Sequence, residues 1–378
     1  MFQKETWGSK LGFVLAAAGS SVGLGNLWGF AYRASQGGGG AFILLYICIV
    51  LLVCLPLLVA EMILGRSTRS SPLAAPKSIG GRNWTPLGWL FILVSVGILS
   101  YYVVLMGYAG NTLVNATFGN LPIDKLEAAN YFPSISTGST SLLGQISSLL
   151  LTGLVVAAGI RGGIERLTRW GMPMLILMLL GLALWASFQP NASEGYAFLF
   201  GWDATKLKDP ETISNAFKQA FFSVGTGIGA ILAYSVYLDR RSSIPGEAIA
   251  VITLDTAVGL MAGCVTFPLV AILGLGELVG SGSVGTLFST LPHGLALPSL
   301  GVIGWLVSVT FFALVYIAAI TSSISLLEVP VSSLMDSLGW SRSKSVWLSI
   351  LLIALIGLPS AFDVDFLVKV DSLMNILL

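Results

Sequence analysis

The sequence predicts an all-α polytopic membrane protein, a bundle of helices that cross a lipid bilayer. Of its 378 residues, 55% are hydrophobic and only 10% are charged, whereas a soluble domain carries about 25% charged residues. The uncharged stretches at residues 34–60 and 83–123 exceed the roughly 20 residues that a spanning helix needs. A membrane β-barrel is disfavoured, because its strands are alternating segments of about 10 residues.

We expect ten membrane-spanning helices, separated by short polar connections. They lie at residues 11–35, 40–64, 86–116, 141–159, 166–188, 212–238, 246–275, 299–335, 345–360 and 364 to the end. The connection at residues 276–298 is rich in glycine and serine, and its central GTLFST is expected to form a short helix in a lid-like loop. Since the sequence ends early in the last span, the fold is expected to be truncated in or after the tenth helix.

The distribution of charge gives the orientation and excludes some function classes. Arginine and lysine gather in every second loop, for example at Arg66 and Arg161, so the N-terminus is expected to be cytoplasmic and the location to be the cell inner (plasma) membrane. A net charge of +1 gives no reason to expect a nucleic-acid partner. The single histidine, His293, and the three cysteines form no catalytic or metal-binding pattern, so no enzyme activity is expected.

Two of the expected helices are interrupted by small residues. The first reads AAAGSSVGLGNLWGF from Ala16 to Phe30, and the sixth reads KQAFFSVGTGIGAILAY, with small residues from Ser223 to Gly229. Because the interruptions are five spans apart, and five is odd, they predict two repeats of opposite topology, 1–188 and 189–378, in one transport domain. Such paired breaks point to a transporter's binding site. Close helix packing is the alternative use of these glycines, but their matched placement favours a site.

An unwound turn in a membrane helix supplies ligands for ions. It frees backbone carbonyls, and each unsatisfied polar group costs several kcal/mol in lipid. Sodium is a hard cation that prefers oxygen ligands, so it can satisfy such carbonyls. The freed N–H groups at a half-helix N-terminus carry partial positive charge and favour a carboxylate. The two breaks therefore suit sodium together with an anionic substrate group.

Five motifs resemble those of the neurotransmitter:sodium symporter family, especially its bacterial amino-acid transporters. They are WGSKLGFVLAAAGSSVGLGNLWGF, GGGAF, SYYV, QAFFSVGTGIGAI and AAITSSISLLE, and the resemblance runs from Trp7 to about Asp371. It implies a leucine-transporter-like fold of two inverted five-helix repeats with unwound first and sixth helices. It also implies a monomeric or dimeric symporter that couples sodium to amino acids with apolar or aromatic side chains by alternating access. A non-transporting amino-acid sensor on the same fold is the alternative.

The resemblance assigns ligands to two sodium sites and to a substrate site. The first sodium site would use Ser21, Asn26, Ser223 and Asp255. The second sodium site would use Gly19, Val22, Ala318, Thr321 and Ser322. The substrate would contact Ser21, Leu24, Gly25, Ile98, Tyr102, Phe222, Ser223, Gly225, Ile228, Ser323 and Leu326. Without the resemblance, Tyr102 is as readily a packed aromatic residue, and Thr321 and Ser322 could bond to their own helix.

Asp255 lies near the middle of the seventh expected span, where a carboxylate is costly and functional by default. Relatives often carry asparagine there, and the chloride-dependent ones carry serine four residues later, where this chain has Gly259. We therefore expect chloride-independent transport, with Asp255 supplying the negative charge. A second hypothesis is that Asp255 takes up a proton when the empty carrier returns.

The expected gates lie at the two ends of the site. At the outer gate Gly29 replaces the arginine usual in the family, and either Arg33, one turn later, or Lys218 could face Asp371. Arg33 could instead extend to the membrane surface. The expected inner gate consists of four residues. Lys4 would form an ion pair with Asp336, and Trp7 and Tyr237 would pack around this pair. Glu61 is expected to accept hydrogen bonds from the unwound sixth helix.

Overall fold

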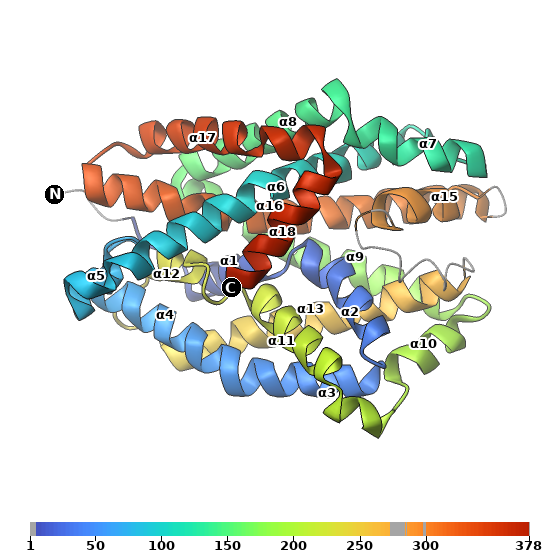
Figure 1. Cartoon of the computed structure of the whole chain (residues 1–378), viewed down its shortest axis with the longest axis horizontal. Coiled ribbons are helices and arrows are strands. Elements are labelled where there is room, and N and C mark those ends of the chain that lie inside the picture. Colours follow the sequence, from blue (N-terminus) through green and yellow to red (C-terminus); the bar gives the residue numbers. More distant parts are fainter. Residues whose placement is uncertain (1–4, 273–283, 285, 298–299, 378) are drawn as a thin grey trace.

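A computed structural model describes residues 5–272, 284, 286–297 and 300–377, and helices are the regular elements of this part of the chain (Figure 1). The first half contains α1 (Lys10–Ser21), η1 (Gly25–Gly29), α2 (Phe30–Gln36), α3 (Gly40–Ile49), η2 (Val50–Cys54), α4 (Leu55–Thr68), α5 (Ala75–Gly80), η3 (Arg82–Trp84), α6 (Thr85–Thr117), α7 (Lys125–Ser136), α8 (Gly138–Ala157), η4 (Ile160–Glu165) and α9 (Arg166–Ser187). The second half contains α10 (Ala192–Phe200), η5 (Ala204–Lys208), α11 (Pro210–Val224), α12 (Ala230–Ser235), α13 (Ile244–Ile272), η7 (Thr286–Thr290), α15 (Leu291–Leu295), α16 (Gly301–Leu338), α17 (Arg342–Phe362) and α18 (Val364–Leu377).

Helix is present at all ten positions where the sequence predicts a span. Within the described residues, seven helices are long and apolar enough to cross a membrane, and the bent pair of α1 with η1 and α2 raises this number to eight. The sixth predicted span is not among these helices, because it is divided into α11 and α12, which have 15 and 6 residues and are each too short to cross a membrane. The tenth, α18, has 14 residues. The predicted short helix in the lid-like connection is present as η7, and residues 276–283, 285 and 298 of that connection lie outside the described part.

Both predicted breaks are present. The α1 helix ends at Ser21, Val22 is extended, and the chain resumes as helix at Gly25 after a bend of 68°. The α11 helix ends at Val224, and the next turn is made by three glycines with positive φ, Gly225 (+69°), Gly227 (+87°) and Gly229 (+82°). An L side chain disfavours this left-handed conformation, so glycine is what allows the helix to stop and restart here.

The start of α11 is set by residues outside the membrane-spanning segments. Asp209 caps the helix by accepting a hydrogen bond from the Glu211 N–H, and Pro210 occupies the first helical position. The hydrogen bond from Lys206, reinforced by those from Thr212 and Glu211, lowers the pKa of Asp209 below its ordinary value. The cap thus defines the start of α11, whereas the glycine turn defines its end.

The longest helix, α16, runs through the middle of the bundle (Figure 1) and packs against α1, α6, α8, α9, α12 and α17. From Ala318 to Ser333 its residues are buried without interruption. Large apolar side chains on the outer helices are instead exposed, for example Leu52 (75%) on η2 and Leu177 (68%) on α9. Such outward apolar surface is stable in lipid and unfavourable in water.

Candidate ion and substrate site

The two broken helices meet α6 and α16 at a cavity of about 40 Å³. Its walls are apolar or uncharged, and no charged side chain lines it. The lining residues are Ser20, Ser21, Gly23, Leu24, Gly25, Asn26, Ile98, Tyr102, Phe222, Gly225, Ile228, Ala230, Ser322, Ser325 and Leu326. Nine of the eleven predicted substrate residues are in this list, so folding brings most of that predicted site together.

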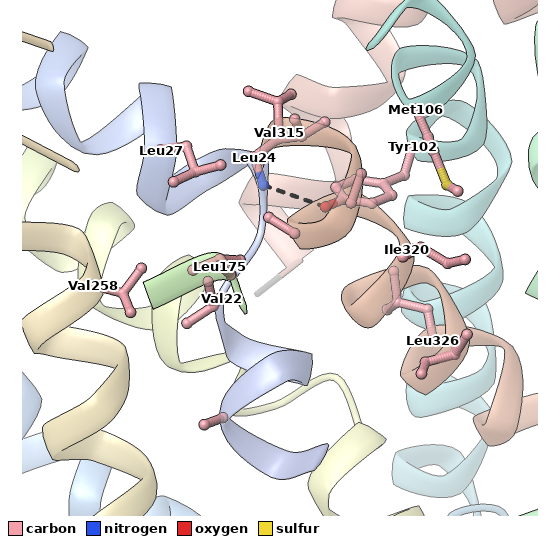
Figure 2. Close-up of a cluster of buried hydrophobic side chains, with 14 of the residues drawn as sticks. Val22, Leu24, Leu27, Tyr102, Met106, Leu175, Val258, Val315, Ile320 and Leu326 are labelled. Carbon is pink, nitrogen blue, oxygen red and sulfur yellow. Dashed lines mark hydrogen bonds between the residues drawn. The ribbon is translucent and has the colours of Figure 1, made fainter. Parts of the chain in front are cut away.

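Side chains satisfy the backbone groups that the breaks expose. Tyr102 reaches from α6 to the break in the first helix, where its hydroxyl oxygen accepts a hydrogen bond from the Leu24 N–H at 3.3 Å (Figure 2). The Gly25 carbonyl accepts from Gln219 Nε2 at 3.2 Å. In the sixth helix, the Gly227 N–H donates to Glu61 Oε1 at 2.6 Å. The predicted role of Glu61 is thus confirmed.

Three predicted ligands of the first sodium site form one buried hydrogen-bonded group. Asn26 Nδ2 donates to Asp255 Oδ1 at 2.7 Å and to Ser223 Oγ at 2.8 Å. The Ser223 hydroxyl in turn donates to Asp255 Oδ2 at 2.7 Å. Ser21 lies beside the group, with its hydroxyl on the Val224 carbonyl at 3.0 Å. Because Asp255 is fully buried and has no cationic side chain within ion-pair distance among the described residues, this carboxylate group suits a small cation.

The predicted ligands of the second sodium site also converge. The Ser322 hydroxyl lies within hydrogen-bonding distance of three carbonyl oxygens, those of Val22 at 3.1 Å, Ala318 at 3.3 Å and Gly19 at 3.4 Å. Thr321 Oγ1 donates to the same Ala318 carbonyl at 3.0 Å. A Cβ atom on Gly19 would lie 3.2 Å from Cβ of Thr321, so glycine permits this close approach of α1 to α16. Five oxygens with no competing positive charge fit a hard cation.

Two predicted substrate residues lie outside the cavity lining. Ser223 lies behind it, in the Asp255 group. Ser323 does not reach the cavity, because its hydroxyl lies 2.9 Å from Thr152 Oγ1 on α8 and donates to the Ile320 carbonyl. The α16 helix presents Ser322 and Ser325 to the cavity instead. Ser20, Ser325 and Ala230 are lining residues that the sequence reasoning missed, although the spacing of Ser322 and Ser325, about one turn, was a usable signal.

A larger cavity of about 470 Å³ adjoins the first and shares Leu24, Gly25, Tyr102 and Phe222 with it. The predicted gate residues Arg33 and Asp371 both line this cavity. They form no ion pair in the described structure.

Each of the two gate residues has partners of its own. Arg33 Nη1 donates to Gln219 Oε1 at 2.6 Å, and its guanidinium lies 5.8 Å from the centre of the Phe222 ring. Asp371 accepts hydrogen bonds from Tyr101 at 2.7 Å and Asn375 at 3.1 Å. A Cβ on Gly29 would lie 3.8 Å from both Arg33 and Gln219, so Arg33 fills space beside the residue that replaces the usual arginine. Lys218 is exposed and does not line this cavity.

The opposite end of the site is closed by charged residues that the prediction did not include. Arg342 donates to both carboxylate oxygens of Glu328, at 2.7 and 3.1 Å, and lies 3.4 Å from Glu5. Tyr237, a predicted gate aromatic, donates to Glu328 at 2.8 Å. Trp7 Nε1 donates to the Tyr234 carbonyl at 3.0 Å.

Only one member of the expected inner-gate ion pair, Asp336, lies within the described residues. Lys4 lies outside the described residues. Asp336 accepts a hydrogen bond from the Ser71 N–H at 2.9 Å and has no cation partner in the described part. The ion pair that the structure does place at this end joins Arg342 and Glu328, because both side chains extend from their helices into the same buried space.

Comparison with known proteins agrees with this geometry. The model of the sodium:neurotransmitter symporter family matches residues 4–141 and 134–364. The chain is similar to the uncharacterized sodium-dependent transporter YhdH of Bacillus subtilis, with 36% identity over 93% of this chain and 77% of that protein. It is also similar to the sodium-dependent serotonin transporter of Drosophila melanogaster, with 26% identity over 94% of this chain and 64% of that protein.

Among solved structures, the chain is similar to MhsT, whose crystal structure is a complex with L-phenylalanine. The TM-score is 0.86 and the identity 36%, over 95% of this chain and 80% of that chain. The breaks, the oxygen-lined sites and these matches agree on one conclusion. The chain belongs to the sodium:neurotransmitter symporter family, as a sodium-dependent, multi-pass membrane transporter with the leucine-transporter-like fold.

Proposed function

We propose that this protein couples the entry of neutral amino acids to sodium at two sites, by alternating access and without chloride. The observation that carries the proposal is the convergence of the Gly19, Val22 and Ala318 carbonyls on Ser322, beside the cavity and close to the buried Asp255 group. The L-phenylalanine in MhsT supports an amino-acid substrate. The uncharged lining supports a neutral side chain, because a charge placed there would lack a partner.

In this proposal the substrate backbone lies against the broken helices. Its carboxylate takes the N–H groups near Leu24 and Gly25 and the Tyr102 hydroxyl, which the structure already joins to Leu24. Its amine faces the carbonyls of Ser21 and Phe222. The carboxylate then lies next to the first sodium site and completes its shell, so ion and substrate bind more tightly together than apart.

The remaining expectations about topology belong to the same proposal. Residues 1–188 and 189–378 form inverted repeats in one transport domain, in the plasma membrane and with a cytoplasmic N-terminus. The Arg342–Glu328 end is then the inner side, and the 470 Å³ cavity opens to the outside. Release of substrate and sodium inward requires the contacts around Glu328 to break while Arg33 and Asp371, which form no ion pair in the described structure, close together across the outer cavity.

Proteoliposomes that contain the full chain test the proposal. Labelled neutral amino acids are added with an inward sodium gradient, with equal sodium on both sides, or with potassium replacing sodium. We expect accumulation above the outside concentration only with the gradient, no uptake in potassium, and equal accumulation when gluconate replaces chloride. Uptake without sodium would contradict the coupling. Saturable binding with no flux under any gradient would instead identify a sensor.

A further inference from the structure

Two serine hydroxyls lie together in the otherwise apolar part of the smaller cavity. Ser20, in the last turn of α1, donates to Ser325 Oγ on α16 at 2.7 Å. Ser325 in turn donates to the Ser322 carbonyl at 2.8 Å. Both serines line the cavity, and neither belongs to the predicted sodium or substrate ligands.

The direction of these hydrogen bonds follows from the number of protons. A serine hydroxyl has one proton and two lone pairs. Since the proton of Ser325 goes to the Ser322 carbonyl, the proton between the two serines must come from Ser20. Ser20 Oγ therefore has no proton left to donate, and both of its lone pairs remain available. No described group donates to Ser20, whose side chain is only partly buried, whereas Ser325 is 1% exposed.

The surroundings of Ser20 exclude a charged partner. The apolar side chains of the cavity lining include Ile98, Ile228, Ala230 and Leu326, and no charged side chain lines the cavity. A neutral side chain that carries a hydroxyl or N–H donor would bury its apolar part against these walls and give its proton to Ser20. A side chain that can only accept hydrogen bonds would find no donor at Ser20 or Ser325, because each serine already donates its single proton.

We propose that Ser20 selects, among neutral amino acids, those whose side chain carries one hydroxyl or N–H donor. This inference rests on the proposed function, since it assigns the substrate side chain to the same cavity. The expected selectivity is modest, because Ser20 and Ser325 satisfy each other when the donor is missing. One neutral hydrogen bond corresponds to about a 3- to 10-fold preference, far less than in sites where a missing partner leaves buried groups unpaired.

Paired substrates measure this preference in the reconstituted full chain. Threonine is compared with valine, and tyrosine with phenylalanine, because each pair has nearly the same shape and differs in one hydroxyl. We expect sodium-driven kcat/KM to favour the hydroxyl-bearing member by about 3- to 10-fold in at least one pair. The Ser20→Ala variant should bring that ratio close to one by slowing the hydroxyl-bearing substrate while leaving its analogue unchanged.

Two further variants separate selectivity from folding. Ser20→Cys keeps the size but offers only a weak acceptor, so it should also lower the ratio. Ser308→Ala is the matched control, since this buried serine of α16 donates to its own helix at the Gly304 carbonyl and lies outside the cavity lining. It should keep the ratio of the unmodified chain.

The possible failures are distinguishable. A ratio near one for both pairs in the unmodified chain, with intact sodium-driven uptake, overturns the role of Ser20 and leaves the proposed function standing. A ratio that survives both Ser20 substitutions overturns it as well. If no neutral amino acid is taken up with sodium, the proposed function and this inference both fail.

Discussion

At the scale of single residues, Asp255 carries the strongest functional signal. It is a fully buried carboxylate whose two oxygens are held by Asn26 and Ser223. Burying an unpaired charge costs more than two neutral donors return, so a cation at this position would stabilise the group. In the proposed function the same charge takes the place of a chloride ion, so Gly259, one turn further along α13, would not have to supply a chloride ligand.

This explanation can be tested by replacing the Asp255 carboxylate with a neutral side chain and providing a ligand for chloride in its place. A serine at 259 fits, since its Cβ would lie 3.9 Å from both Asn26 Nδ2 and Tyr46 Oη. Asp255→Asn alone should raise the sodium concentration for half-maximal uptake by about 10- to 100-fold, because a charge-assisted ligand is lost. Asp255→Asn combined with Gly259→Ser should regain uptake only in chloride. The single Gly259→Ser variant should stay chloride-independent, and a several-fold loss of uptake by the unmodified chain in gluconate would contradict the idea.

Arg33 is the second residue whose role can be tested separately. Its hydrogen bond to Gln219 and its position near the Phe222 ring place a cation in the larger cavity, beside a residue that lines both cavities. Arg33→Gln should speed dissociation of bound substrate by about 3- to 10-fold, while the sodium dependence stays unchanged. Substrate washout from preloaded protein in detergent measures this rate. The exposed Arg240 supplies the control, Arg240→Gln, and equal washout from all three proteins would exclude a gating role for Arg33.

At the scale of elements, the two broken helices differ in how they are broken. The first bends through Val22 with ordinary backbone angles, whereas the sixth turns through three glycines of positive φ. Side chains then satisfy the exposed groups, Tyr102 at the first break and Glu61 at the second. Both breaks thus depend on a side chain from a neighbouring helix, and the second depends in addition on its own glycines.

Alanine at Gly225 isolates this backbone contribution. A Cβ there meets only Ile228 Cδ1, at 3.9 Å, so the cost is conformational and about 1 kcal/mol. The apparent melting temperature should fall by about 1–2 °C, because the unfolding entropy of a chain of 378 residues is roughly 0.8 kcal/mol/K. Gly181→Ala is the control, because that glycine has an ordinary helical φ and no atom within 4 Å of an added Cβ. This control should melt at or slightly above the original temperature, and an equal fall in both variants would argue against left-handed strain.

At the scale of the whole molecule, one end of the site is closed and the other adjoins a large cavity. The closed end joins the N-terminal segment to distant helices, since Glu5 lies near Arg342 and also accepts the Ile160 N–H at 2.6 Å. Gly8 donates in the same way to Glu165 at the start of α9. Because these contacts are polar and exchangeable, they suit a closure that must open in each cycle.

The pair Arg342–Glu328 tests how strongly this end is held. The two side chains are 9% and 0% exposed. Removal of Arg342 leaves the Glu328 carboxylate buried without a counter-ion, at about 3–5 kcal/mol, and removal of Glu328 leaves Arg342 with only the partly exposed Glu5, at 3.4 Å, as its ion-pair partner. Glu328→Gln or Arg342→Gln should therefore lower the stability of the protein strongly. The double variant should recover much of the loss, since neither charge is then unpaired. Thermal unfolding in detergent measures all four proteins, and additive losses in the double variant would rule out direct coupling.

The sequence by itself determined the ten helical positions, both breaks and most of the residues that line the candidate substrate cavity. Charge-free runs mark the helices, and clusters of small residues in two of them mark the breaks. A buried acid such as Asp255 or Glu61 is conspicuous in an apolar span. The motifs then assigned Asn26, Ser223 and Ser322, and the structure brings each of these close to its expected partners.

Only the tertiary structure decided which way each helix faces. A membrane helix is apolar nearly all round, so it has no strong periodicity that fixes its rotation about its axis. The family resemblance placed Ser323 in the cavity, whereas α16 turns it toward Thr152 and presents Ser325 instead. Contacts between residues distant in sequence, such as Glu5 with Arg342, could not be predicted either. Such a contact depends on how the helices pack, and the sequence of a single segment does not determine that packing.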